Sequence, residues 1–129
     1  EARIPSLPDS LAYEVRMATE RQVTYTGIVA DRNLFTPGFL MDPSHPVVDA
    51  AARAVGRRGD ATEAAEVRMW TFATDGGWSH GVNGIPTVGF APGEERFAHT
   101  NRERMLVEEA RWGFERYPGL IKAVQTALN

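Results

Sequence analysis

Apolar residues recur at the spacing of an amphipathic helix in four stretches of the chain. These stretches are residues 6–20, 45–56, 102–117 and 120–128. The second is the clearest, because Ser44 or His45 can cap its start, Pro46 suits the first turn and Gly56 suits the end. Its predicted buried stripe consists of Val47, Val48, Ala51, Ala52 and Val55.

The C-terminal stretches predict two consecutive helices. Thr100 and Glu103 match a capping box, in which two side chains satisfy backbone N–H groups at the start of a helix. The helix that follows is predicted to bury Met105, Leu106, Ala110 and Phe114. Pro118 and Gly119 predict a break, after which the last helix runs to the end of the chain.

Three other stretches have the pattern of β-strands. Residues 21–30 alternate and are rich in β-branched side chains, which predicts an antiparallel strand with one face in water. Residues 67–73 and 85–91 are almost continuously apolar, which favours buried strands of a parallel sheet. Residues 74–84 leave room for a short helix, so these segments predict a right-handed crossover. Residues 31–44 form a predicted loop that docks through large apolar side chains.

The amino-acid composition limits the kinds of functional site that the chain can form. The 129 residues carry a formal net charge of −3, and the arginines are interleaved with Asp and Glu, so no basic stripe marks a nucleic-acid site. No cysteine is present, and any metal would therefore be held by His, Asp and Glu, which suit Zn, Mn or Co. The sequence contains neither an apolar run of membrane-spanning length nor a signal-peptide pattern, and we expect a cytoplasmic protein with no membrane partner.

Polar and glycine residues follow the two predicted parallel strands, at the edge where α/β enzymes place functional groups. Thr74 and Asp75 begin a Thr-Asp-Gly-Gly turn after the first strand, and its glycines permit close approach to a ligand. Gly93 follows the second strand and can turn backbone N–H groups toward an anion. His99 ends the same loop and is a candidate metal ligand. The plainer interpretations are an Asp-capped tight turn and a surface or helix-capping histidine.

These residues do not form a complete site by themselves. No two of the three histidines (His45, His80 and His99) have the i, i+4 spacing of a helical zinc motif. A nucleophile with its base and orienting group is not visible either. The Gly-rich turn is neither GxGxxG nor a P-loop, so nucleotide binding has no support.

The order of these motifs resembles the C-terminal part of the M20 metallopeptidase family. The most specific stretch is GIPTVGFAPG followed by AHTNRE, which ends at Glu103. The family includes hydrolases of the acetylornithine deacetylase, succinyl-diaminopimelate desuccinylase and carboxypeptidase G2 type.

The resemblance implies an α/β fold. Residues 34–129 would be the C-terminal portion of a mostly parallel-sheet zinc-hydrolase catalytic domain. Residues 1–33 would be the end of an α+β lid domain, through which such enzymes commonly dimerise, so a homo-oligomer is expected. The other metal ligands and the general base of the family belong to an N-terminal half, and we expect the chain to be a fragment of a longer protein.

The resemblance also implies roles for individual residues. His99 matches the last metal-ligating histidine of the family, and Gly93 matches the loop whose backbone meets the substrate carboxylate. Thr74 and Asp75 match a substrate-side turn, and Asn101 is one of the polar residues after the ligand. The intact enzyme would hold one or two zinc ions, with Co or Mn as alternatives, and would cleave amide bonds of N-acyl amino acids or small peptides. The chain itself would be inactive. The alternative is a non-catalytic binding or dimerisation module.

Overall fold

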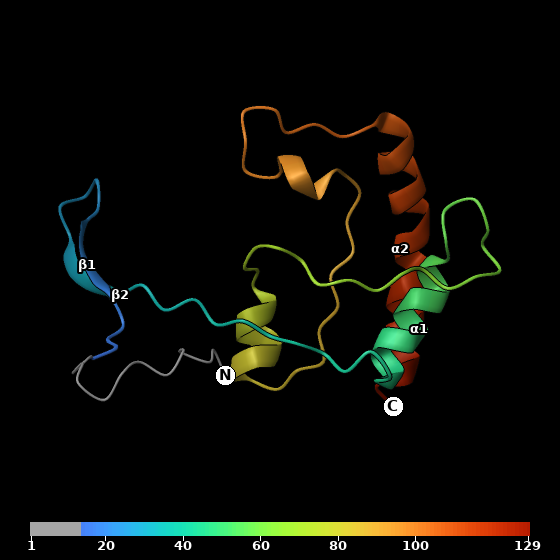
Figure 1. The fold of residues 1–129 in the computed structure, drawn as a ribbon, viewed down its shortest axis with the longest axis horizontal. Coiled ribbons are helices and arrows are strands. Elements are labelled where there is room, and N and C mark those ends of the chain that lie inside the picture. Colours follow the sequence, from blue (N-terminus) through green and yellow to red (C-terminus); the bar gives the residue numbers. More distant parts are fainter. Residues whose placement is uncertain (1–13) are drawn as a thin grey trace, which may run out of the picture. The chain divides into compact units, whose positions relative to one another are not determined.

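The structure is a computed structural model that describes residues 14–129 (Figure 1). Its contacts divide the chain into two compact units, Glu1–Phe35 and Thr36–Asn129. The predicted division lies between residues 33 and 34. The assignment of the two units to a lid and a catalytic domain stays a prediction.

The first unit contains a β-hairpin. Strand β1 (Thr19–Val23) pairs antiparallel with β2 (Val29–Asn33), so that Val23 lies opposite Val29. Gly27 adopts a φ of 82° in the connecting turn, a conformation that glycine takes without steric cost. The single strand predicted over residues 21–30 is therefore two strand ends and a turn.

The helix predicted over residues 6–20 is not supported where it can be checked. Residues 6–13 lie outside the described residues, residues 14–18 have no regular structure, and Thr19 and Glu20 begin β1. Pairing with β2 satisfies the backbone groups that a helix would otherwise use, and it outweighs the weak helical pattern.

The second unit contains helix α1 (Pro46–Val55), as predicted. The His45 ring accepts a hydrogen bond from the Val47 N–H through Nδ1 at 3.2 Å, so His45 caps the start. Gly56 ends the helix with a φ of 68° and donates its N–H to the Ala52 carbonyl at 3.0 Å. The stripe is confirmed: Val47, Val48, Ala51 and Val55 are buried, and Ala52 is partly buried.

The C-terminal region forms one helix instead of two. Helix α2 (Val107–Ala127) continues through Pro118, and the predicted break is wrong. The predicted start is also wrong, because residues 100–106 form turns and irregular structure before α2 begins. Gly113 and Leu120 are its buried residues, which orients the helix so that Phe114 is 78% exposed. Met105 and Leu106 precede α2 and are exposed as well, contrary to the prediction.

The two runs predicted as parallel strands are irregular in the structure. Residues 67–73 and 85–91 are not assigned to strands, because neither run hydrogen-bonds to a neighbouring strand among residues 14–129. The short helix between them is confirmed as η1 (Gly77–Val82), a π-helical turn. The parallel sheet itself stays a prediction.

The core of the second unit lies between α1 and α2, which run side by side (Figure 1). It consists of Ala51, Val55 and Leu120, and Val88, Phe90, Trp112 and Val124 pack against it. This core is small, and large apolar side chains such as Met69, which is 77% exposed, remain outside it. None of the helices formed by residues 14–129 is long and apolar enough to cross a membrane.

Candidate functional site

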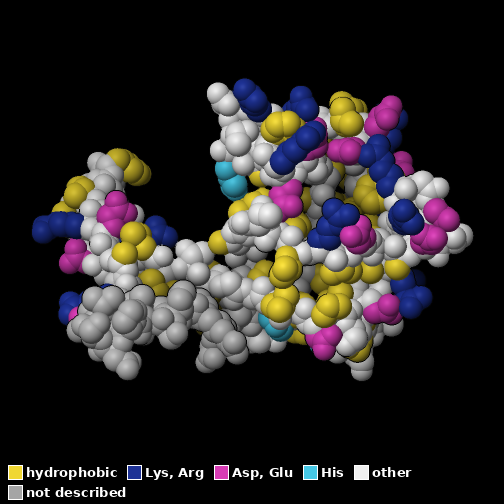
Figure 2. All heavy atoms as spheres, in the orientation of Figure 1, with side chains coloured by type: hydrophobic (Ala, Val, Ile, Leu, Met, Phe, Trp, Pro, Cys, Tyr) yellow, Lys and Arg dark blue, Asp and Glu magenta, His cyan; other side chains and the backbone are white. Residues whose placement is uncertain are grey.

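An open cleft of about 1540 Å³ crosses the second unit. Its apolar wall comes from α1, through Val48, Ala51 and Val55, and from Leu120 of α2. The irregular runs on either side of η1 supply most of the remaining lining. Figure 2 shows apolar side chains exposed across the middle of this unit, with charged side chains around them. The cleft is therefore mainly apolar, with polar side chains among its lining.

Four of the five predicted site residues lie along the lining of this one cleft. Thr74, Asp75, Gly93 and His99 all line the cleft, although they are up to 25 residues apart in sequence. Asn101 does not line it. Glu103, a predicted helix cap, does line the cleft.

His99 has an unusual backbone conformation. Its φ is 61°, the one positive value at a non-glycine residue among residues 14–129. The His99 N–H donates to the Glu103 carboxylate at 3.3 Å, and the Thr100 hydroxyl donates to the Phe97 carbonyl at 2.7 Å. Such a conformation costs free energy and persists where surrounding contacts hold it, which is common at functional sites. Here the side chain of Glu103 supplies one of these contacts.

The His99 imidazole and the Phe72 ring pack nearly perpendicular to each other, at 86°, with the ring centroids 5.3 Å apart. The residue is exposed and faces the cleft from a turn that follows the short helix η2 (Glu95–Phe97). An imidazole held against an aromatic ring and open to solvent keeps a nitrogen lone pair available for a ligand.

Thr74 and Asp75 organise the start of η1. The Thr74 hydroxyl accepts the Gly76 N–H at 3.2 Å, and the Asp75 carbonyl accepts the N–H groups of Trp78 and Ser79 at 3.0 Å each. The Asp75 carboxylate takes part in neither interaction and remains exposed. The plainer interpretation was a tight turn capped by Asp75; the turn is present, but its side-chain acceptor is the Thr74 hydroxyl and not the Asp75 carboxylate.

The two glycines of this turn serve packing instead of ligand approach. A Cβ on Gly77 would lie 1.8 Å from the Pro37 carbonyl oxygen, and a Cβ on Gly76 would lie 2.2 Å from Cε1 of Phe39. The predicted docking of the loop over residues 31–44 is thus confirmed for Pro37 and Phe39. The expectation that these glycines face a ligand is wrong, because the loop already fills that space.

Gly93 separates two hollows of the second unit. It has a φ of 119°, and an added Cβ would meet no atom within 4 Å. It lines the large cleft and also a smaller pocket of about 190 Å³ beside Pro92. Backbone conformation, and not space, therefore requires glycine here.

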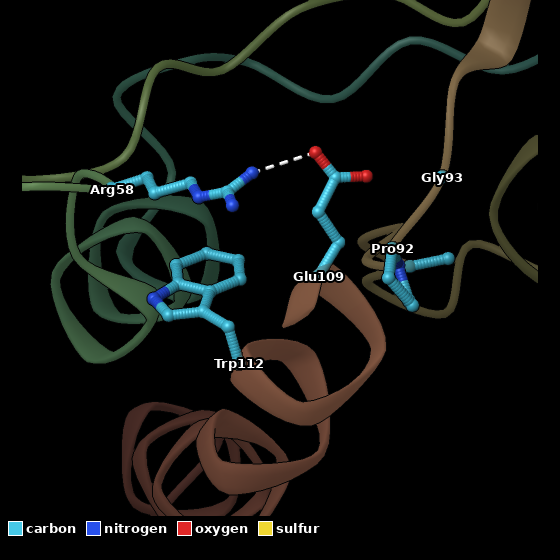
Figure 3. A pocket seen from close by; sticks show the side chains of 6 residues that line it. Arg58, Pro92, Gly93, Glu109 and Trp112 are labelled. Carbon is cyan, nitrogen blue, oxygen red and sulfur yellow. Dashed lines mark hydrogen bonds and ion pairs between the residues drawn. The ribbon is translucent and has the colours of Figure 1, made fainter. Parts of the chain in front are cut away.

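The smaller pocket was not predicted. An ion pair of 2.6 Å joins the Arg58 guanidinium to the Glu109 carboxylate across its mouth, and the Trp112 indole lies beside Arg58 (Figure 3). These residues are 51 positions apart, and no local pattern links them. Only the packing of α2 against the loop after α1 brings them together.

A second group of charges near the site was also missed. The Glu94 carboxylate pairs with Arg96 and with Arg104, the latter at 3.1 Å. The hydrogen bond from Arg96 is the main cause that holds the pKa of Glu94 below its usual range, and Arg104 contributes to it. Both guanidinium groups also lie over the Phe97 ring, with Cζ 4.7 and 4.5 Å from its centroid. This cluster braces the loop that ends in His99.

The loop is attached to the cleft wall by Glu95. Its carboxylate accepts the Thr71 N–H at 2.6 Å and the Thr71 hydroxyl at 3.0 Å. A carboxylate with two hydrogen-bond donors is already in use and is a poor candidate for a catalytic base.

The described residues do not provide a complete metal site. No group of three or more His, Asp or Glu side chains in residues 14–129 is arranged to hold a metal ion. One imidazole, that of His99, can contribute a ligand, but stable zinc binding needs three or four. We therefore derive no reaction step through a metal on this chain.

Part of the chain is similar in sequence to parts of known proteins. The chain is 33% identical over 90 residues to the uncharacterized protein YgeY of Escherichia coli K12, which covers 70% of the chain and 22% of YgeY. It is 30% identical over 84 residues to the N-formyl-4-amino-5-aminomethyl-2-methylpyrimidine deformylase of Bacillus subtilis, which covers 65% of the chain and 19% of the deformylase. The chain spans about a fifth of the length of these relatives.

No model of a known protein family matches the chain, and no solved structure matches it. The matches to YgeY and to the deformylase are partial and of low identity, but both extend over about two thirds of the chain. They relate this chain in sequence to part of YgeY and to part of a deformylase, which is a hydrolase.

Proposed function

We propose that this chain is part of a metal-dependent hydrolase that cleaves amide bonds of N-acyl amino acids or small peptides. The observation that carries the proposal is the convergence of Thr74, Asp75, Gly93 and His99 on one cleft. The similarity to a deformylase, an enzyme named for removing a formyl group, supports the same reaction class.

In this proposal His99 supplies one metal ligand. Its strained backbone, held by Glu103, is the kind of fixed geometry that a ligand position needs. The metal is zinc, as one or two ions, with Co or Mn as alternatives. The remaining ligands and the catalytic base come from outside the described residues, within which no three His, Asp or Glu side chains are grouped to hold a metal ion. The fragment alone is then inactive.

Gly93, Thr74 and Asp75 have substrate-side roles in the proposal. A φ of 119° at Gly93 exposes backbone N–H groups of the loop, which can donate to a substrate carboxylate. The free Asp75 carboxylate at the other side of the cleft suits a cationic or N–H-donating part of the substrate. Asn101 has no such support, since it does not line the cleft.

A chimaera tests the proposal. In this chimaera the chain replaces the matched 84 residues of the B. subtilis deformylase. The chimaera is assayed for bound zinc and for release of formate from the N-formyl pyrimidine after which the deformylase is named. We expect zinc and measurable hydrolysis. The His99→Asn variant keeps a residue that tolerates positive φ but removes the imidazole. It should lose at least ten-fold in metal affinity or activity.

A matched substitution at another histidine is the control. His45 caps the start of α1 and has no predicted role in the site. Because asparagine also caps helices well, the His45→Asn variant should keep its metal and its activity. Unchanged zinc and activity in His99→Asn would contradict the role of His99. An inactive, metal-free chimaera that folds would favour the second candidate, a non-catalytic binding or dimerisation module, which the large exposed apolar cleft also suits.

A further inference from the structure

The segment that carries His99 has one polar attachment to the rest of the second unit. Residues 94–105 comprise η2, His99 and the turns before α2. The hydrogen bonds and ion pairs of this segment, such as those of Glu94, mostly stay within it. Within the described part of the chain, only the two hydrogen bonds accepted by Glu95 join the segment to residues outside it.

Both of these hydrogen bonds end on one oxygen of the Glu95 carboxylate. Oε1 accepts the Thr71 N–H at 2.6 Å and the Thr71 hydroxyl at 3.0 Å. The other oxygen, Oε2, accepts no hydrogen bond from residues 14–129. The contact with Thr71 therefore needs an acceptor oxygen at this place, which an amide provides as well as a carboxylate does.

The residue after Thr71 meets His99. Thr71 and Phe72 lie in a bend of the chain, and the Phe72 ring packs against the imidazole with the centroids 5.3 Å apart. On its other neighbour, Phe72 packs with Trp70 at 5.6 Å between centroids. The Glu95–Thr71 and His99–Phe72 contacts thus join the same two segments at adjacent points.

The remaining contacts around His99 act within the segment. The Glu103 carboxylate accepts the His99 N–H at 3.3 Å, and Arg104 pairs with Glu94 at 3.1 Å. These contacts shape the loop, but they move with it and do not fix it to the cleft wall. A ring contact such as that with Phe72 is weak by itself, so the hydrogen bonds of Glu95 are needed to maintain it.

We propose that Glu95 is a positioning residue, whose hydrogen bonds to Thr71 keep the His99 imidazole against Phe72 and facing the cleft. The use of this position rests on the proposed function, in which His99 is a metal ligand. The contact itself forms without a metal. Residues that orient a metal ligand strengthen metal binding because the ligand is already in place when the ion arrives.

The first experiment measures the ring contact in the whole chain without metal. NMR should show a nuclear Overhauser effect between ring protons of His99 and Phe72. Glu95→Met keeps the length of the side chain but removes the acceptor, and the effect should disappear. Glu95→Gln keeps an oxygen that can accept both hydrogen bonds, and the effect should remain.

The second experiment measures zinc affinity in the deformylase chimaera. Glu95→Met should weaken zinc binding about ten-fold or more, and Glu95→Gln should weaken it less than about three-fold. Glu115→Met removes a negative charge from an exposed position of α2 and is the matched control. It should change neither the ring contact nor the zinc affinity.

Thr71→Val tests the same contact from its other side. It removes the hydroxyl donor and keeps the N–H donor, so the effect on zinc affinity should lie between those of the two Glu95 variants. The Overhauser effect should become weaker without disappearing. This variant decides the matter if urea titration shows that Glu95→Met does not fold.

The proposal is overturned if the ring contact survives in a folded Glu95→Met variant or is unchanged in Thr71→Val. It is also overturned if Glu95→Gln loses the ring contact or weakens zinc binding as much as Glu95→Met does, because the charge would then be the required property. If the ring contact follows the acceptor oxygen but the unsubstituted chimaera binds no zinc, the proposed function fails and the positioning role of Glu95 stands.

Discussion

The Trp70 indole occupies the space that a side chain at position 89 would need. A Cβ built on Gly89 lies 2.9 Å from both Cζ2 and Cη2 of that ring. The Trp70 ring therefore packs directly on the backbone of Gly89. This contact joins the two irregular runs on either side of η1, and no backbone hydrogen bond does so. This contact gives a direct way to measure how firmly the runs are held together.

Gly89→Ala should destabilise the second unit by about 1–2 kcal/mol, because the added methyl group displaces the Trp70 ring. The free energy of unfolding from urea titration measures the effect. Gly119→Ala, at a position in α2 where a Cβ meets nothing within 4 Å, should instead stabilise by about 0.5–1 kcal/mol. If the clash with Trp70 is the cause, Gly89→Ala should cost little in a Trp70→Leu background.

Gly77→Ala should be more damaging, at about 2–3 kcal/mol or more, since the new Cβ meets the Pro37 carbonyl 1.8 Å away and backbone cannot rotate aside. The loop around Phe39 should detach, which limited proteolysis and near-ultraviolet circular dichroism can detect. Gly38→Ala, where no atom lies within 4 Å of the added group, is the matched control. Equal stability of the two variants would mean that the loop does not dock as described.

Substitutions at position 99 should rank by their tolerance of positive φ. His99→Asn and His99→Val both lose the ring contact with Phe72, but asparagine adopts this conformation far more readily than a β-branched residue. Asn should therefore be more stable than Val by about 1–2 kcal/mol in chemical denaturation. A reversed order would show that the backbone at His99 relaxes to negative φ.

The pH dependence of the Glu94 cluster has a defined sign. The pKa of Glu94 is lower in the folded chain, chiefly because Arg96 donates to it. Its contribution to stability is complete above the ordinary range of a glutamate, about pH 4–5, and is lost as the pH falls through the lowered folded pKa. Carboxyl titration by NMR should show a larger upward shift of this pKa in Arg96→Gln than in Arg104→Gln. No shift in either variant would contradict the pairing.

Local patterns predicted the elements whose causes are local. Helix α1 follows from a stripe at helical spacing, a capping side chain at His45 and a glycine at its end, all within twelve residues. The sequence likewise predicted the short helix η1 and the docking of Phe39, because turn glycines and apolar residues in a loop are local signals. Thr74, Asp75, Gly93 and His99 were selected because each follows an apolar run, and all four line one cleft, whereas their roles stay predictions.

Predictions failed where the answer depended on distant residues. Residues 67–73 have strand composition, but a strand exists only with a neighbour, and no local signal says whether one is present. Thr100 and Glu103 resemble a capping box, yet the Glu103 carboxylate accepts the N–H of His99 and the Thr100 hydroxyl accepts that of Arg102, which closes a turn and not a helix. The Arg58–Glu109 pair could not be foreseen, since packing alone joins its members.

Pro118 lies between two parts of α2 that make different contacts. Pro118 has no N–H to donate to the carbonyl one turn earlier, so the helix lacks one internal hydrogen bond at that point. Before it, Glu109 and Trp112 line the small pocket, and after it, Leu120 packs in the core against α1. The turn of α2 that lacks this hydrogen bond is therefore held by side-chain contacts on both sides, through Glu109 and Trp112 before it and through Leu120 after it.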